Sequence, residues 1–269
     1  MKIYDCFTYF NENLILDLRF KILDKYVDYF VIVEANKTHT NEEKKKNFQI
    51  EKFKKYKKKI KYFFIENTPN SNNAWELENF QRNQISLGLK EARKEDLILI
   101  SDCDEIPNLK EIENINLEKF DKNIFAFEQK CFYYKLNLFN PKSNPWYGTK
   151  LIRYDLLKKF TPQKIRNYKT KQYSFWRIDK PKNVIIIKNG GWHFSFLNSI
   201  NNIILKLKSY AHTEFNKKNF VNKKNLLNKL KDHKDLFDEG IYLKKISLDD
   251  SFPAYITRNK KKFKKWIAL

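Results

Sequence analysis

The sequence contains little cysteine, and its three cysteines form no recognisable motif. Cys6, Cys103 and Cys131 are odd in number and lie among apolar or aromatic neighbours. No two of them have the CxxC spacing that is typical of metal or redox sites. Buried free thiols are therefore the expected state of all three.

Long hydrophobic runs are also absent. No uncharged stretch approaches the roughly 18 residues that a membrane-crossing helix needs, and "MKIYDCFTYF" at the start contains no apolar core of a signal peptide. We therefore expect a soluble, cytoplasmic protein. The segment "KKKFKKWIAL" places Trp266, Ile267 and Leu269 beside a basic cluster. It resembles a peripheral anchor for the anionic inner face of a membrane, and a solvated terminal helix is the alternative.

Arginine is scarce although the chain is strongly basic. The formal net charge is +22, yet only seven of the 54 basic residues are arginines. Proteins that read nucleic acids rely on the bidentate fork of arginine, and the sequence contains no known nucleic-acid-binding module. Lysine is spread along the chain with much Asn and Ile, which favours a solvated surface. A basic nucleic-acid-binding protein is the less favoured alternative.

Strand and helix patterns alternate through the first part of the chain. Apolar runs at residues 29–36, 59–67 and 96–105 predict buried strands, and helical spacing precedes the first of them and recurs at about 75–94. This alternation predicts a doubly wound α/β sheet whose ligands bind beyond the carboxyl ends of its strands. Aromatic residues make up 16% of the chain, so it should fold despite a mean hydropathy of -0.70.

The later part of the chain has a different character. Residues 124–187 are rich in aromatic and β-forming residues interrupted by Pro and Gly, which predicts mixed or antiparallel sheet with active-site loops. From Asn198 onward, apolar residues return to helical spacing among many lysines. We therefore predict an α/β domain over residues 1–198 and a basic helical extension over residues 199–269 that packs on it.

The stretch "LILISDCDEIPN" combines a buried strand with acidic residues at its carboxyl end. Residues two apart on a strand face the same way, so Asp102 and Asp104 project together while Cys103 points toward the packing. Two such carboxylates suit a hard divalent cation, which relieves their repulsion and accepts phosphate oxygens. A solvated turn that caps a following helix is the alternative.

Two further positions are candidates for the same site. In "NGGWHFSF", Gly190 and Gly191 permit a close ligand approach, and His193 could complete a metal site that suits Mn²⁺ better than Mg²⁺. A histidine satisfied within the core is the alternative. Arg82, one helix before the aspartates, could reach a nucleotide phosphate or sugar. Its alternative is a surface ion pair with Glu78 at the i, i+4 spacing.

Four motifs in this order resemble family 17 of the glycosyltransferases. They are "YDCFTYFNENLILDLRFKILDKYVDYFVIVEANKTHTN", "ENFQRNQI", "DLILISDCDEIPN" and "GGWHFSFL", and they span roughly residues 4–198. The resemblance implies a GT-A-like nucleotide-sugar-binding fold, with a mixed, mainly parallel central sheet flanked by helices and here a C-terminal helical tail. It also implies Mn²⁺ or Mg²⁺ as cofactor, a UDP-sugar donor, GlcNAc as the transferred sugar, and inversion at the anomeric carbon.

The resemblance assigns roles position by position. Asp102 and Asp104 match the DxD motif, with Asp104 as the direct metal ligand and Asp102 at ribose or metal-bound water. His193 matches a later metal or diphosphate contact, and Glu34 and Ala35 match the strand end that contacts uracil and ribose. The absence of an anchor and a secretory stem makes a bacterial or viral-type glycan, built on a lipid or polysaccharide, the expected acceptor.

The residues that act on the acceptor are less well defined by the sequence. A carboxylate should deprotonate the attacking hydroxyl, and the candidates for this base are Glu105, Glu128 and Asp179. A sugar-stacking platform could come from Trp146, Tyr147 and Trp176, for which core packing is the alternative. A metal-dependent phosphohydrolase is the remaining alternative function, and it should carry more carboxylate or His ligands so as to assemble two metals.

Overall fold

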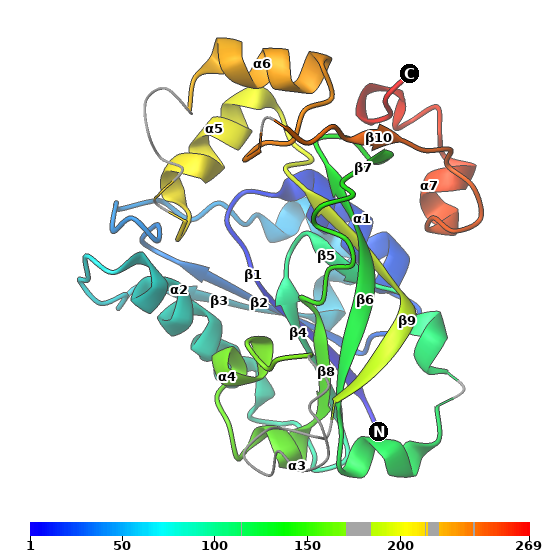
Figure 1. Cartoon of the computed structure of the whole chain (residues 1–269). Helices are drawn as coiled ribbons and strands as arrows, with labels where there is room; N and C mark the ends of the chain where they lie inside the picture. The colour runs from blue at the N-terminus through cyan, green and yellow to red at the C-terminus, as the bar shows by residue number, and fades with distance from the viewer. Residues whose placement is uncertain (114, 171–183, 213, 215–220, 239) are drawn as a thin grey trace, which may run out of the picture.

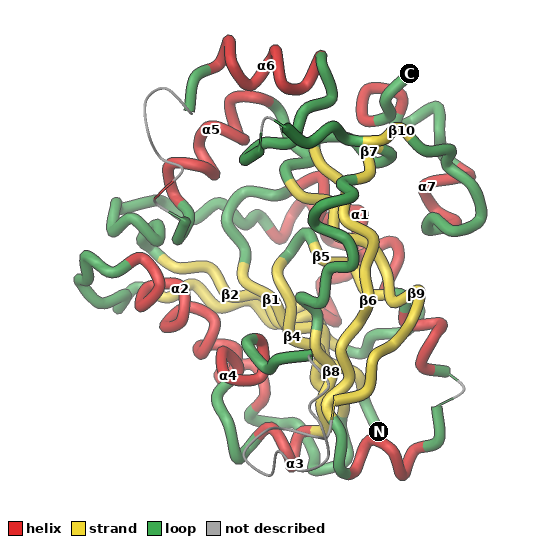
Figure 2. The backbone as a smooth tube through the Cα atoms, in the orientation of Figure 1, coloured by secondary structure: helices red, strands yellow, loops and turns green. Residues whose placement is uncertain are grey.

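The computed structural model describes residues 1–113, 115–170, 184–212, 214, 221–238 and 240–269. Within these residues ten strands form one mixed sheet (Figures 1 and 2). The predicted α/β class, with a mixed and mostly parallel central sheet flanked by helices, is confirmed. The expected free and buried state of the three cysteines is confirmed as well. In the described part of the chain no helix is long and apolar enough to span a membrane.

Four parallel strands form the first half of the sheet. They are β1 (Ile3–Thr8), β2 (Tyr29–Ala35), β3 (Ile60–Ile65) and β4 (Leu97–Asp102). β1 lies between β2 and β4, and its last residue, Thr8, pairs with Asp102. The ends of β1 and β4 are therefore level. This brings residues 102–105 at the end of β4, which we call the acidic turn, beside the loop after β1.

The apolar runs of these strands are buried on both faces. Along β2, Phe30 and Ile32 belong to one core, whereas Val31 and Val33 belong to the other. The helix α1 (Asn13–Leu23) and the 3-10 helix η1 (Ile50–Lys59) cover the first face. The 3-10 helix η2 (Gln84–Leu89) covers the second. Because helices cover both faces, unbroken apolar runs replace the alternation of a half-exposed strand.

The helix predicted over 75–94 is shorter in the structure. The helix α2 (Ala74–Asn83) ends and the chain tightens into η2. Gly88 in η2 lies directly on β2, because a Cβ atom at this position would be 2.3 Å from Val31 Cγ1. This close packing requires glycine.

The second half of the sheet is mixed, as predicted for residues 124–187. β8 (Lys150–Arg153) is antiparallel to β4 and to β6 (Ile124–Tyr133), and β6 is parallel to β9 (Val184–Ser195). The short strand β5 (Glu105–Pro107) pairs with β9, so that Glu105 is opposite His193. This pairing joins the acidic turn to the segment that contains Gly190, Gly191 and His193. Residues 171–183 lie outside the described part.

The remaining elements are short. They are η3 (Leu109–Ile112), η4 (Leu117–Asp121), β7 (Leu138–Phe139), α3 (Tyr154–Leu157), α4 (Pro162–Arg166), α5 (Ile200–Ser209), α6 (Lys223–Lys231), β10 (Lys244–Lys245), α7 (Ala254–Arg258) and η6 (Lys264–Trp266). The extension after residue 198 packs on the sheet, since Leu207 and Leu226 share a core with Tyr133. It also adds β10 to the sheet beside β7, a strand that the helical spacing did not predict.

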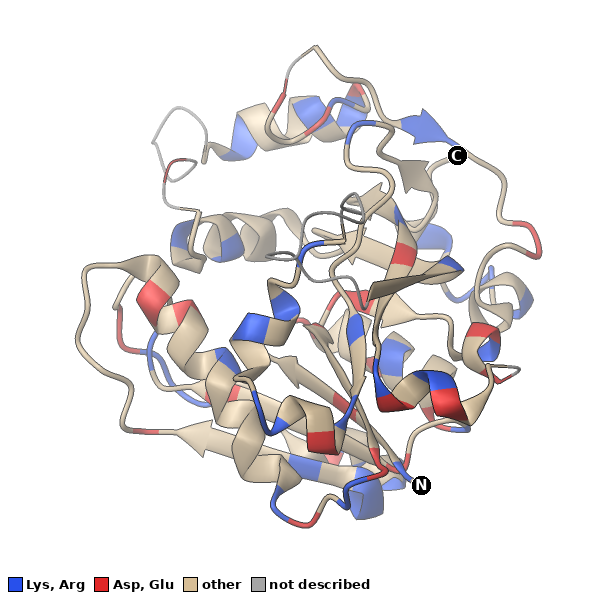
Figure 3. Cartoon of the chain, turned by 60° about the horizontal axis from the view of Figure 1, so that its bottom comes forward, with Lys and Arg blue, Asp and Glu red and all other residues tan. Residues whose placement is uncertain are grey.

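The surface carries its positive charge on many elements. Lys and Arg recur on helices, strands and loops around the molecule, with Asp and Glu between them (Figure 3). This arrangement agrees with the interpretation of lysine as a general surface residue.

Candidate active site

A cavity of about 400 Å³ lies at the carboxyl ends of the parallel strands. We call it the strand-end cavity. Segments far apart in the sequence form its walls, namely the residues after β1, β2 and β4, one face of α2, the end of α4, the end of β9, and α5 with the residues that follow it. Its charged lining residues are Glu12, Lys37, Lys44, Glu78, Arg82, Asp102, Asp104, Arg166 and Lys206.

Arg19 holds the acidic turn in place by hydrogen bonds to the backbone of the turn. This buried guanidinium of α1 donates to the backbone oxygens of Asp102, Cys103 and Glu105 at 3.0, 3.2 and 2.7 Å. Its other nitrogens pair with the buried carboxylate of Asp5 on β1 at 2.5 and 2.7 Å. One fixed arginine fork therefore neutralises a buried charge and sets the backbone on which the two aspartates stand.

Asp102 lies between two arginines. Its Oδ1 accepts from Arg82 at 2.7 Å and its Oδ2 from Arg166 at 2.9 Å. Burial alone would raise the pKa of this carboxyl, but Arg166 and Arg82 outweigh burial and hold the pKa well below its usual range. Arg82 also pairs with Glu78 at 2.7 Å. The structure therefore contains both arrangements considered for Arg82, the helix ion pair and a place in the cavity.

Asp104 meets a lysine and the predicted histidine. Its Oδ2 is 2.9 Å from Lys206 Nζ, and its Oδ1 is 3.6 Å from His193 Nε2. Burial opposes ionisation here too, but Lys206 and then His193 hold the pKa of Asp104 below its usual range. Lys206 also approaches Glu12 at 3.3 Å. Asp104 is therefore a carboxylate at neutral pH.

His193 is fixed from three sides. Its Nδ1 is 3.6 Å from Cys131 Sγ on the neighbouring strand, and the ring of Trp146 lies 4.7 Å from its ring. Burial disfavours the charged imidazole, but Cys131 and then Asp104 hold the pKa of His193 well above its usual range. The imidazole is thus oriented with Nε2 toward Asp104. A carboxylate and an imidazole nitrogen at this separation are suitable ligands for one divalent cation.

The metal-binding groups of the chain itself are few. The described residues contain no group of three or more His, Cys, Asp and Glu side chains that could hold a metal ion. Asp104 and His193 could supply two ligands, and the oxygens of a bound diphosphate could supply others. Both oxygens of Asp102 accept from arginines, which fits the second role considered for it, at ribose or metal-bound water, better than direct ligation.

Several predicted residues lie outside the strand-end cavity. Glu34 is fully buried and accepts from the backbone of Asn47 and Phe48 and from Tyr62, at 2.7, 3.0 and 2.8 Å. It organises the loop after β2, and neither it nor Ala35 lines the cavity.

The two base candidates within the described residues also lie outside it. Glu105 is fully buried beneath the cavity, where Oε1 accepts from Arg166 and from Trp146 Nε1, both at 2.6 Å. Glu128 pairs with the Tyr147 hydroxyl at 2.9 Å and with Lys188 at 2.7 Å. Neither carboxylate lines the cavity. Asp179, like Trp176, lies outside the described residues.

Of the two residues of the proposed acceptor platform that the structure describes, Trp146 lines the cavity and Tyr147 turns toward Glu128. Sequence reasoning missed Arg166, Lys206, Glu12 and Trp75, which all line it. One signal was available for Arg166. In a chain that uses lysine on its surface, each of the few arginines is a candidate for a fixed bidentate contact.

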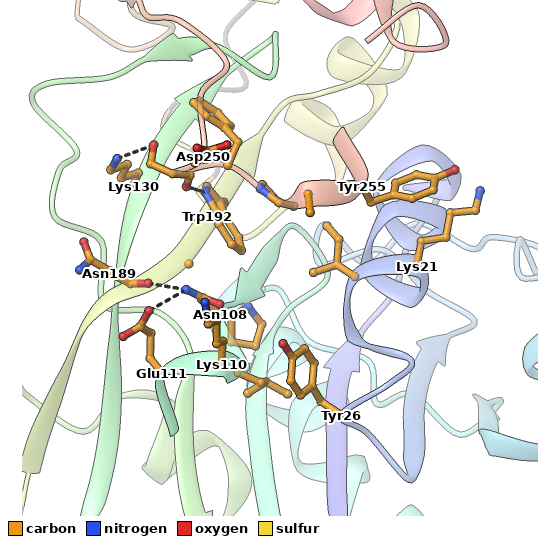
Figure 4. A pocket seen from close by; sticks show the side chains of 18 of the residues that line it. Lys21, Tyr26, Asn108, Lys110, Glu111, Lys130, Asn189, Trp192, Asp250 and Tyr255 are labelled. Carbon is orange, nitrogen blue, oxygen red and sulfur yellow. Dashed lines mark hydrogen bonds between the residues drawn. The ribbon is translucent and has the colours of Figure 1, made fainter. Parts of the chain in front are cut away.

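A larger cavity of about 810 Å³ lies on the other side of the β5–β9 layer (Figure 4). Lys21 of α1, Tyr26 in the turn after α1, Trp192 of β9 and Tyr255 of α7 line it. Trp192 and His193 are neighbours on one strand, so they face opposite sides. This second cavity therefore contains neither the aspartates nor His193.

The comparison with protein families agrees with the geometry. The model of glycosyltransferase family 17 matches residues 1–242, which include the whole parallel half of the sheet, the acidic turn and His193. A comparison with curated proteins gives no match. Enzymes of such a family use a nucleotide-sugar donor and a glycan acceptor, which neither the phosphohydrolase nor the nucleic-acid-binding alternative would require. The chain belongs to glycosyltransferase family 17 and is a glycosyltransferase.

Proposed function

We propose that the protein is a metal-dependent, inverting N-acetylglucosaminyltransferase that uses UDP-GlcNAc. The observation that carries this proposal is the meeting of Asp104 and His193 at 3.6 Å, beside Asp102, in a cavity at the carboxyl ends of parallel strands. Doubly wound sheets bind nucleotides at this edge. The donor sugar comes from the family resemblance.

The cavity offers fixed cations for a donor diphosphate. Arg82 and Arg166 are buried or nearly so and are held by carboxylates, and Lys206 is held by Asp104 and Glu12. Such preorganised charges need not reorient as negative charge develops on the departing UDP. When bound by Asp104 and His193, Mn²⁺ or Mg²⁺ would supply further charge neutralisation. His193 would have to release its proton to bind the metal, so metal binding should weaken as the pH falls.

The base in this proposal is Glu78. Within the described residues, Glu78 Oε2 is the carboxylate oxygen in the cavity for which the structure gives neither a hydrogen bond nor an ion pair, while Oε1 is held by Arg82. The acceptor hydroxyl oxygen attacks the anomeric carbon and gives its proton to Glu78. The bond to the diphosphate oxygen breaks, and UDP leaves with that electron pair. Trp146 and the half-exposed ring of Trp75 would stack on sugar or base.

A thermal-shift panel of nucleotide sugars with Mn²⁺, repeated with EDTA, tests the donor and the metal together. A ligand that binds only the native state at a hundredfold excess over Kd stabilises it by about 2.7 kcal/mol. We expect UDP-GlcNAc to give the largest shift and EDTA to remove most of it. A preference for GDP-sugars would overturn the donor, and an EDTA-insensitive shift would overturn the metal.

Matched carboxylate variants test the base. Glu78→Gln should lower kcat by about 100- to 10,000-fold with little change in UDP-GlcNAc binding. Glu128→Gln, which removes a carboxylate outside the cavity, is the control and should retain turnover. Equal turnover in the two variants would exclude Glu78 as the base.

A further inference from the structure

A third concave surface lies at the end of the molecule that carries the C-terminus and α6 (Figure 1). It has a volume of about 760 Å³, and three segments form it: the turn after β6, the end of α6, and residues 261–269. We call it the basic groove. Its lining residues are Lys135, Leu138, Leu230, Lys231, His233, Lys261, Lys262, Lys264, Lys265, Ile267, Ala268 and Leu269.

The basic groove differs from the other two cavities in its charge balance. Among the residues that the structure describes, six lysines line it and no Asp or Glu side chain does. The strand-end cavity has five Lys and Arg against four Asp and Glu, and the cavity of Figure 4 has five against two. A general lysine bias would affect all three alike, so the bias alone does not explain a surface without any acidic side chain.

The lysines of the groove are held close together. The half-buried Lys135 donates to the backbone oxygen of Lys265 at 2.6 Å. Burial first, and then the charge of Lys265, lower the pKa of Lys135. A bound anion would relieve this repulsion, and the groove therefore favours an anionic partner over an empty state.

The other lining residues indicate which anion fits. Leu230 and Ile267, both partly exposed, give the groove apolar surface beside the lysines, whereas Leu138 is fully buried beneath them. Among its described lining residues there is no arginine and no Phe, Tyr or Trp, so it has few of the groups that stack on bases and grip single nucleic-acid strands. Phosphate groups attached to hydrocarbon match both the lysines and the apolar side chains.

Residues 261–269 are fixed to the rest of the protein and do not form a free helix. The backbone oxygen of Trp266 accepts from Leu136 at 2.8 Å, and Asn137 accepts from the Ala268 amide at 2.7 Å. Trp266 itself packs against the main core. The lysines of this segment therefore have fixed positions opposite Lys135 and Lys231.

We propose that the basic groove docks the enzyme on the phosphate groups of an anionic phospholipid bilayer. The lysines contact the headgroups, and the apolar residues between them face the boundary with the acyl chains. This docking does not depend on the proposed donor or mechanism, because the groove shares no lining residue with the strand-end cavity.

Vesicle co-sedimentation with the full chain tests the proposal. We expect binding to phosphatidylcholine vesicles that contain phosphatidylglycerol, little binding to phosphatidylcholine alone, and release at high salt. The triple variant Lys231→Gln, Lys261→Gln, Lys264→Gln should partition about 100-fold more weakly, since each basic residue near an anionic surface contributes about a factor of five.

A matched triple variant controls for net charge. Lys52→Gln, Lys57→Gln, Lys58→Gln removes three exposed charges from η1 and should weaken binding far less. Both variants should turn over a soluble acceptor at the wild-type rate. No binding to anionic vesicles at low salt would overturn the proposal, and so would equal losses in the two variants. Groove-dependent binding of a single-stranded oligonucleotide that is tighter than vesicle binding would assign the groove to nucleic acid instead.

Discussion

The strand-end cavity and the basic groove use charge in opposite ways. In the cavity, Asp102 and Asp104 are each paired with cations from other elements, and Glu105 beneath them is paired as well. Among the described residues that line the groove there is no Asp or Glu, and of its lysines Lys262 alone approaches a carboxylate, that of Asp17 at 3.8 Å. A net charge of +22 describes neither region. Charge that is fixed in pairs suits catalysis, whereas unbalanced charge at the surface suits association with an anionic partner.

The largest expected effect comes from removing a paired buried cation. Arg19→Met leaves the Asp5 carboxylate buried without its partner, which should lower the free energy of unfolding by about 3–5 kcal/mol. It also removes the donor that fixes the acidic turn. Urea denaturation measures the loss of stability.

The double variant Arg19→Met, Asp5→Leu separates stability from activity. It removes both charges, so much of the stability should return. Transferase activity should stay low, because the backbone oxygens of the turn still lack their donor. Full recovery of activity in the double variant would show that Arg19 does not position Asp102 and Asp104.

A smaller loss, confined to activity, is expected at Asp104. Asp104→Asn keeps the shape of the side chain but removes the charge that faces Lys206 and His193. We expect kcat/KM to fall by about 100- to 1,000-fold and the response to Mn²⁺ to be lost. The melting temperature should change little, since Glu12 still pairs with Lys206. Near-normal turnover with an unaltered metal response would contradict the role of Asp104.

The sequence predicted the parts of this site that depend on local patterns. The apolar run of β4 and the two-residue period identified Asp102 and Asp104 at the strand end. Arg166 and Lys206 reach these aspartates from 64 and 102 residues away, and no local pattern marks such contacts. Lys206 lies among many lysines at helical spacing, so its sequence does not distinguish it. Glu34 stands at a strand end, and this position alone suggested a contact with the donor. Its side chain instead turns inward and accepts from Tyr62.

Unlike Asp102 and Asp104, Lys150 forms no ion pair among the described residues. It is buried, and burial first, followed by the charge of Arg166, lowers its pKa to about 7, although Glu105 opposes the shift. In the unfolded chain its pKa is about 10.4. Between these values the unfolded chain binds more protons, so this group makes stability rise with pH from about 7 to 10. Below pH 7 the folded protein must carry the buried charge.

Lys150→Met should therefore be more stable than the wild type at pH 6, by about 2 kcal/mol, and this advantage should shrink toward pH 9.5. Urea denaturation at several pH values measures the difference. Lys57→Met, at an exposed position, is the control and should show no comparable trend. A constant difference at all pH values would mean that Lys150 does not titrate in this range.

The smallest effect is expected in the basic groove, and it has the opposite sign to that at Arg19. The groove variant Lys231→Gln, Lys261→Gln, Lys264→Gln removes three cations that repel their neighbours and that no acidic side chain among the described groove residues balances. At low ionic strength and without vesicles, it should be as stable as the wild type or up to about 1 kcal/mol more stable. Salt screens repulsion between exposed charges, so the gain should vanish at about 1 M salt.

The η1 variant Lys52→Gln, Lys57→Gln, Lys58→Gln should gain less, because Glu51 already offsets charge on that helix by pairing with Lys54 at 3.0 Å. Urea denaturation at two salt concentrations makes the comparison. A loss of more than about 1 kcal/mol in the groove variant would mean that its lysines support the fold, and the contrast between paired and unpaired charge would then fail.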